Sequence, residues 1–201
     1  MAMSSRWALV PVVAIAVSGC AIVEQPVLRP FADGQEFQVL RPLPYELRDT
    51  TQRIVVPSGF VTDLASIPRA FWVLLPKNDR HMVAAIVHDY LYWKQTCSRD
   101  EADEVLRLAM RDARVPKWKE EVIYRAVRLG GGAAWQSNAS ARAAGRLRII
   151  PPAHENVPPD STWQQYQEVL LAKGILASAE DAARIDPHVC ASVRSRLSGP
   201  K

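Results

Sequence analysis

A histidine and two aspartates in the middle of the chain combine the residue types of a general acid–base site. His88 is followed directly by Asp89, and Asp103 comes after a short polar segment. A near-neutral imidazole can take a proton from water, and a carboxylate on its other ring nitrogen fixes its tautomer and its aim. If His88 and Asp103 meet in the fold, the pair offers a base and a group that orients it.

Two predicted helices would bring these groups together. The first starts after Pro76, with Asn78 or Asp79 as its N-cap, because an apolar repeat of helical period follows. The second opens at Ser98, where Glu101 completes a capping box.

The connection between these helices, residues 94–97, is short enough to make them antiparallel neighbours. His88 and Asp103 lie equally far from the middle of this turn, roughly 11 Å at a rise of ~1.5 Å per residue. Both side chains are therefore expected at the same height on facing helices. Tyr92 lies one turn from His88 on about the same face, whereas Asp89 points roughly 100° away and forms a separate carboxylate.

The N-terminal segment has the features of an export signal. Arg6 precedes an apolar run from Trp7 to Val17, which is too short to span a bilayer as a permanent helix. Small residues then lead to Cys20, and this pattern resembles a bacterial lipoprotein signal that is cleaved before the cysteine. The resemblance implies acylation (palmitate) at Cys20, and Ala21 at the next position resembles the pattern of outer-membrane lipoproteins. We therefore expect a lipid-anchored protein at the periplasmic face of the outer membrane.

Export also bears on the other two cysteines. In an oxidising compartment, Cys97 and Cys190 remain as a pair once Cys20 is acylated. A disulfide between them would join the turn of the helical hairpin to the C-terminal helix. The alternative is two free thiols, and the sequence leaves both open.

Composition sets broader limits. The 201 residues, 48% of them hydrophobic and 23% charged, suffice for one domain with a sizeable core plus tails. The formal net charge of +4 falls to +3 when Arg6 leaves with the signal. This mild excess suits an anionic membrane surface and argues against nucleic acid as a partner. Arg142, Arg146 and Arg148 form a modest basic patch, which we interpret as solvated surface.

The order of the segments predicts an α+β fold, with a small antiparallel β-sheet followed by a helical bundle. The strand-like pieces are residues 36–40, 45–48 and 53–56. A third helix follows Pro116, and Gly130–Gly132 are expected to loosen or end it. The expected organisation is a signal at 1–19, a lipidated tether at 20–34, a core α+β domain at 35–136, a Pro-rich connector at 137–160 and C-terminal helices at 161–201.

The hairpin and the loop before it carry three long motifs. They are VPSGFVTDLASIPR at 56–69, AAIVHDYLY at 84–92 and SRDEAD at 98–103, with a fainter echo in AVRLGGGAAW at 126–135. These motifs resemble a family of phage and bacterial proteins, the domain of unknown function 1353. The resemblance brings no established activity with it.

The helix pair is similar to a second family. The pattern His88-Asp89-x-x-Tyr92, followed by Asp103 on the facing helix, resembles the paired helices of secreted phospholipase A2. The resemblance implies that His88 is the general base and that Asp103 orients it. It also implies that Tyr92 hydrogen-bonds Asp103 and that Asp89 binds calcium. The chain lacks most of that family's glycine-rich calcium loop, and Asp63 is the best candidate for a second calcium ligand.

Two main hypotheses remain open. The first is an envelope-anchored lipoprotein that hydrolyses an ester bond in envelope lipid, with calcium as its cofactor. The second is a non-catalytic, prophage-derived lipoprotein that binds an envelope or phage protein and uses the His88–Asp103 pair as structural support. A third hypothesis, a transition-metal site of His81, His88 and Asp89 or Asp103, ranks last because a turn-spaced histidine pair is common by chance.

Overall fold

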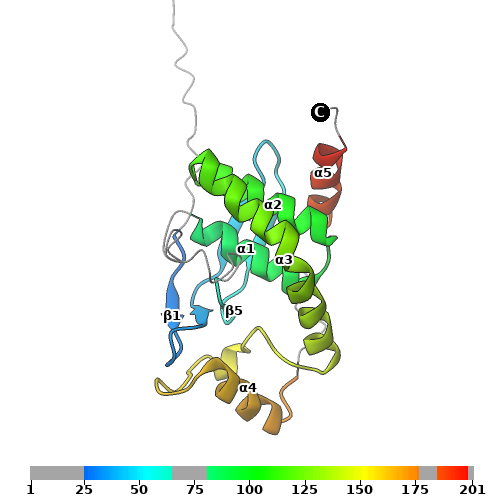
Figure 1. Ribbon diagram of the computed structural model, residues 1–201. Coiled ribbons are helices and arrows are strands. Elements are labelled where there is room, and N and C mark those ends of the chain that lie inside the picture. Colours follow the sequence, from blue (N-terminus) through cyan, green and yellow to red (C-terminus); the bar gives the residue numbers. More distant parts are fainter. Residues whose placement is uncertain (1–24, 65–80, 177–184, 199–201) are drawn as a thin grey trace, which may run out of the picture.

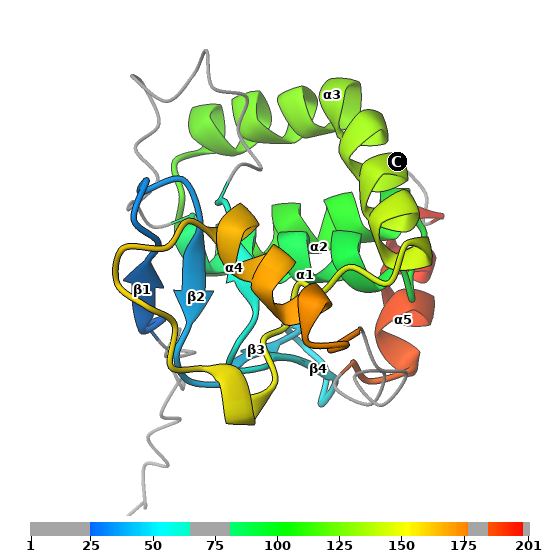
Figure 2. The same ribbon diagram turned by 90° about the horizontal axis from the view of Figure 1, so that it is seen from below.

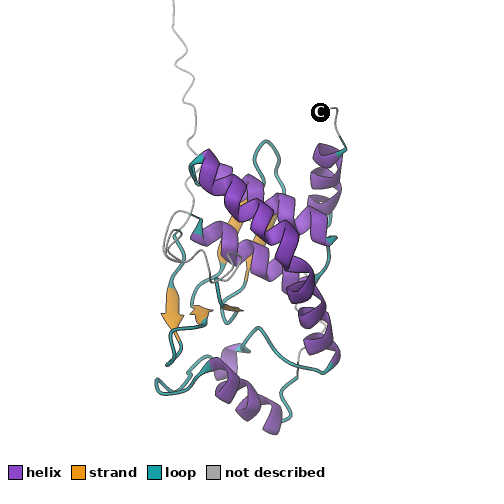
Figure 3. Cartoon of the chain, viewed as in Figure 1, coloured by secondary structure: helices purple, strands orange, loops and turns teal. Residues whose placement is uncertain are grey.

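The chain forms two small antiparallel sheets and five α-helices within residues 25–64, 81–176 and 185–198, the part that the computed structural model describes (Figures 1 and 3). The expected α+β class is confirmed. The strands are β1 (Leu28–Pro30), β2 (Phe37–Val39), β3 (Leu43–Glu46), β4 (Arg53–Val56) and β5 (Val61–Thr62). The helices are α1 (Met82–Lys94), α2 (Arg99–Asp112), α3 (Lys117–Ala143), α4 (Trp163–Ala172) and α5 (His188–Leu197), with a 3-10 turn at Pro152–His154.

The strands make two sheets, where the sequence pattern indicated one. β1, β2 and β5 lie side by side in the first sheet, and β3 pairs with β4 in the second. β1 falls in the segment expected to be a tether, yet Leu28 pairs with Val39 in an antiparallel register. The structure differs from the expectation here because an apolar segment beside an open sheet edge gains backbone hydrogen bonds by pairing.

Helix α1 lies at the centre of the molecule. Every side chain from Val83 to Trp93 is buried, whereas the sequence pattern indicated a single apolar stripe. Helices α2 and α3 and strands β4 and β5 all pack against it. Polar side chains on such a helix must find partners, because burying them unpaired is costly. The expected N-caps, Asn78 and Asp79, lie outside the described residues.

Helix α2 begins as the sequence predicts. The Ser98 side chain accepts a hydrogen bond from the Glu101 backbone N–H, and the Glu101 carboxylate accepts one from the Ser98 N–H. The buried residues Val105, Leu106 and Met110 belong to the same core as α1. Helices α1 and α2 therefore pack directly against each other across the short turn.

Helix α3 continues through Gly130–Gly132, so these glycines do not end it. Figure 2 shows the helix changing direction along its course. Closely spaced glycines favour such a bend because they weaken the helical preference. The helix extends to Ala143, so residues 137–143, which the sequence analysis placed in the connector, are helical.

Helix α5 is tied to the hairpin by a covalent bond. Cys97 and Cys190 form a disulfide, with their Cα atoms 5.3 Å apart. Arg194 also donates a hydrogen bond to the Glu101 carboxylate at 2.7 Å. A crosslink between positions 93 residues apart restricts the unfolded chain and is worth on the order of 4 kcal/mol.

Helix α4 covers a second, smaller core. Its Trp163 and Leu170 pack with Phe31, Val61 and Ile150. This core lies beside the first sheet, so α4 and the sheet support each other. None of the described helices has the length and the apolar composition that crossing a bilayer requires.

Candidate active site

His88 and Asp103 meet between α1 and α2, as their equal distances from the turn predict. Nε2 of His88 lies 3.0 Å from Oδ1 of Asp103. His88 is 2% exposed and Asp103 is fully buried. This contact fixes the imidazole ring and directs its other nitrogen, Nδ1, away from Asp103.

Asp103 accepts hydrogen bonds from two further side chains. The Tyr92 hydroxyl donates to Oδ1 at 2.6 Å, and Arg128 donates from Nη1 to Oδ2 at 3.0 Å. Arg99 Nη1 lies 3.7 Å from the same Oδ2. Burial alone would raise the pKa of Asp103, but the hydrogen bonds from His88, Tyr92 and Arg128 outweigh burial and hold this pKa below its ordinary value. Asp103 is therefore an anion at neutral pH.

The charge of Asp103 selects the tautomer of His88. An ionised carboxylate only accepts hydrogen bonds, so in the neutral imidazole Nε2 carries the proton and Nδ1 carries the lone pair. Burial and the hydrogen bond to Asp103 raise the pKa of Tyr92, which keeps its hydroxyl protonated. The arrangement makes His88 a base through Nδ1 and places an anion where it stabilises the imidazolium.

Asp89 lies on the Nδ1 side of the ring. Its Oδ1 is 4.0 Å from Nδ1 of His88, and its Oδ2 accepts a hydrogen bond from the Thr62 hydroxyl at 2.5 Å. Thr62 belongs to β5, and its hydroxyl also accepts from the Leu64 backbone N–H. The first sheet therefore positions this carboxylate together with α1.

A pocket of about 350 Å³ lies beside His88. From α1 it is lined by His88, Asp89 and Tyr92. From α3 it is lined by Ala126, Val127, Gly130, Gly131, Ala134 and Asn138. Gly130 and Ala134 are exposed, so the pocket is open to solvent. Its volume falls in the range of small-molecule sites.

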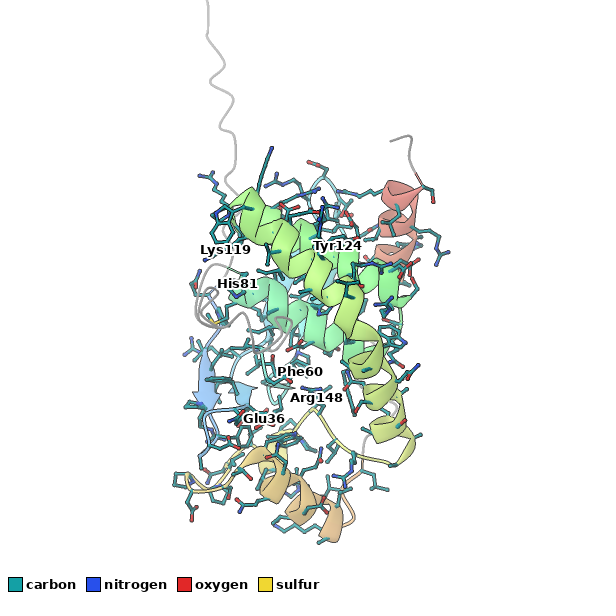
Figure 4. All side chains as sticks on the ribbon, in the orientation of Figure 1. Glu36, Phe60, His81, Lys119, Tyr124 and Arg148 are labelled. Atoms are coloured by element: carbon teal, nitrogen blue, oxygen red, sulfur yellow. A yellow bond between two sulfur atoms is a disulfide. The ribbon has the colours of Figure 1, made fainter. Side chains whose placement is uncertain are left out.

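Arg148 contributes a cation to the pocket lining. Its Nε donates to the Val61 carbonyl and its Nη1 to Asn138 Oδ1, both at 3.0 Å, and its Nη2 lies 3.7 Å from Asp63 Oδ2. In Figure 4 it is labelled between Phe60 and Glu36. The sequence indicates solvated surface for Arg148, and the structure differs because the Val61 N–H donates to the Arg148 carbonyl, which fixes residue 148 beside β5.

Both predicted calcium ligands, Asp89 and Asp63, line the pocket. Calcium takes roughly six to eight oxygen ligands. Among the described residues, Asp89 is engaged by the Thr62 hydroxyl, and Asp63 faces the Arg148 guanidinium. These two carboxylates do not complete a calcium shell by themselves, so the mechanism below assigns no step to calcium.

His81 lies outside the pocket. It is buried at the N-terminal end of α1 (Figure 4). In the described part of the chain, one group of three residues brings potential metal ligands together, namely Cys97, Glu101 and Cys190. The sulfurs of Cys97 and Cys190 are bonded to each other in the disulfide. The transition-metal site of the third hypothesis is therefore not assembled among the described residues.

Three contributors escaped the sequence analysis. Arg128 sits among many helical arginines, and Thr62 belongs to a segment that the sequence predicts as a loop of capping residues, so neither stands out. Gly131 carried a clearer signal, as the centre of a glycine triplet. A Cβ at this position would lie 2.4 Å from the Tyr92 hydroxyl, so glycine leaves the space in which that hydroxyl reaches Asp103.

Comparisons with known proteins find a similarity to a family without a known activity. Residues 37–127 match the family described as "Protein of unknown function (DUF1353)". The uncharacterized protein y4jT of Sinorhizobium fredii (strain NBRC 101917 / NGR234) is 32% identical over 74 residues, which are 36% of this chain and 22% of that protein. The match thus spans less than a quarter of this relative. No solved structure matches the chain.

Proposed function

We propose that this chain, whose residues 37–127 match the DUF1353 family of proteins of unknown function, is a hydrolase with His88 as its general base. The observation that carries the proposal is the 3.0 Å contact between His88 Nε2 and Asp103, next to an open pocket. A buried carboxylate that holds one nitrogen of a histidine orients the ring, so that the other nitrogen serves as the base in such pairs. The proposed substrate is an ester of the cell envelope's lipid.

The reaction requires only water and the ester. Nδ1 of His88 accepts a proton from water while the water oxygen attacks the carbonyl carbon of the ester. The tetrahedral intermediate then breaks its bond to the alcohol oxygen, and the imidazolium returns the proton to this leaving group. The products are a carboxylic acid and an alcohol, and His88 is neutral again. Throughout, the Asp103 anion stabilises the charged ring.

The proposal includes attachment to the membrane. An acyl chain on Cys20 would hold the domain at the periplasmic face of the outer membrane, against its substrate layer. The Cys97–Cys190 disulfide supports an oxidising compartment of this kind. Mass spectrometry of the N-terminal peptide of exported protein should find the acyl groups on Cys20, and Cys20→Ala should release the protein from membranes.

The catalytic proposal is tested with purified protein on soluble esters and on phospholipid vesicles, with and without calcium. Wild-type protein should release acid from the ester, and His88→Ala should reduce the rate to background. His188→Ala is the matched control, because His188 is exposed on α5 and is not part of the pocket lining. A calcium requirement that Asp89→Asn removes would support the ion at Asp89.

The opposite outcome has a defined meaning. If wild-type protein and His88→Ala release acid equally slowly in every condition, the hydrolase proposal fails. His88→Ala would then cost stability alone, about 1–3 kcal/mol for leaving a buried partner unpaired. That result would return the protein to the non-catalytic hypothesis, a lipoprotein that binds an envelope or phage protein.

A further inference from the structure

The glycine triplet of α3 holds three positions with different surroundings. A Cβ at Gly131 would meet the Tyr92 hydroxyl at 2.4 Å, whereas a Cβ at Gly130 or Gly132 would meet nothing within 4 Å. Gly130 lines the pocket beside His88, and Gly132 does not. Two neighbouring positions therefore tolerate a side chain, and only one of them would put it in the pocket.

Gly130 is the centre of a wall without large side chains. Ala126, Gly130 and Ala134 are spaced by four residues, so they lie on one face of α3, and all three line the pocket. Helix α3 is continuous through this region, so its backbone N–H and C=O groups bond within the helix. The wall therefore offers a bound molecule apolar surface along Ala126, Gly130 and Ala134; the polar side chain at its end, Asn138, accepts a hydrogen bond from Arg148.

The charged and titratable groups that line the pocket come from other elements. His88 and Asp89 belong to α1, and Arg148 and Asp63 lie beside β5. A molecule that satisfies both sides must place a reactive polar group at the imidazole and an apolar portion along α3. A water-soluble sugar or phosphate would leave the apolar stretch of Ala126, Gly130 and Ala134 without a favourable contact.

We propose that this wall binds the acyl chain of the substrate and that Gly130 determines how long a chain is accepted. The inference rests on the proposed function for the position of the ester, which sits at His88 Nδ1 with its acyl chain running along α3. Each methylene that the wall removes from water contributes about 0.8 kcal/mol, or roughly fourfold in affinity. A side chain at position 130 would take this space from the chain and leave the imidazole untouched.

The test compares Gly130→Leu with Gly132→Leu. Both changes replace a helical glycine by a good helix former with room for its Cβ, so both variants should fold as wild type by circular dichroism. Binding of a fluorescent fatty acid, cis-parinaric acid, is measured first because it does not depend on catalysis. Wild type and Gly132→Leu should bind it, and Gly130→Leu should bind at least about tenfold more weakly.

Ester hydrolysis supplies the second readout. The ratio of kcat/KM for p-nitrophenyl laurate to that for p-nitrophenyl acetate should fall at least about tenfold in Gly130→Leu and stay unchanged in Gly132→Leu. Failure of wild type to bind the fatty acid, or equal binding by both leucine variants, would overturn the inference. Fatty-acid binding that depends on Gly130 but comes without ester hydrolysis would overturn the hydrolase proposal and leave the chain-binding wall in place.

Discussion

Asp103 and Glu104 are neighbours on α2, and both are buried, but the pKa values of their carboxyl groups shift in opposite directions. The pKa of Asp103 is lowered, because hydrogen bonds from His88, Tyr92 and Arg128 exceed the effect of its burial. The pKa of Glu104 is raised, because burial exceeds the attraction of Arg107 and Arg111. Burial is thus the first influence on both groups, and the donors directed at each carboxylate decide the result.

Glu104 also has arginines nearby, but these arginines donate their hydrogen bonds to another carboxylate. Arg107 and Arg111 donate from Nε to Glu120 at 2.9 and 2.8 Å, and so bind α2 to α3 through a different carboxylate. Asp103, in contrast, has an imidazole on one oxygen and a pocket next to that imidazole. One side of α2 therefore holds a structural ion cluster, and the other holds an anion that orients a base.

Asp103→Asn should show the largest effect. The amide cannot replace the anion between His88 and Arg128, so the free energy of unfolding should fall by about 3–5 kcal/mol, as for other broken buried ion pairs. Glu104→Gln, one residue away, should change it by less than about 1 kcal/mol, because this carboxyl lacks the charged hydrogen bonds of Asp103. Urea unfolding measures both. Equal losses in the two variants would remove the distinction between the regions.

Alanine substitutions in the glycine triplet should show the next largest effect on stability. Gly131→Ala should destabilise the protein by about 1–3 kcal/mol, because the new methyl group displaces the Tyr92 hydroxyl from Asp103. Gly132→Ala should stabilise it by up to about 1 kcal/mol, because alanine favours the helix and meets nothing. Thermal unfolding of the two variants gives the signs, and a stable Gly131→Ala protein would contradict the close approach of Tyr92.

Tyr92→Phe should cost about 1 kcal/mol, because it removes one donor to Asp103 and leaves the ring packed against Trp135. Tyr124→Phe, beside Glu104, is the matched change in the other region and should cost less. Double-mutant cycles with Asp103→Asn measure the coupling. A coupling energy of zero between Tyr92 and Asp103 would mean that the hydroxyl contributes nothing to the anion.

The pH dependence of stability gives the smallest expected effects. Because the pKa of Asp103 is lowered from 3.8 in the folded protein, its contribution is complete above that value and is lost as the pH falls through the folded pKa. Because the pKa of Glu104 is raised from 4.5, its contribution declines as the pH rises from that value through the folded pKa. The free energy of unfolding is measured as a function of pH across this range. Asp103→Asn should lose the fall in stability at low pH, and Glu104→Gln should lose the decline as the pH rises.

Local rules predicted the hairpin well. The capping box at Ser98 and the short turn fixed the register of α1 and α2, and this register alone places His88 level with Asp103. The same rules left open whether Gly130–Gly132 loosen or end α3. The helix does not end there, since packing of α3 against α1 and α2 overrides the weak helical preference of glycine.

Contacts between distant segments lay beyond sequence reasoning. Arg148 reaches the pocket only because its backbone pairs with Val61, far away in the chain. Arg128 becomes a partner of Asp103 only when α3 folds back over α2. Nothing in the local sequence of either arginine separates it from a surface residue, so the His88–Asp103 pair was predictable and its arginine surroundings were not.

The tautomer of His88 tests the central claim most directly. ¹⁵N NMR of the neutral imidazole distinguishes a proton on Nε2 from one on Nδ1. If Asp103 orients His88 as a base, wild type should show the proton on Nε2, with Nδ1 unprotonated beside the pocket, and Asp103→Asn should lose this preference. A proton on Nδ1 in wild-type protein would contradict the account, because the nitrogen beside the pocket could then not accept a proton from water.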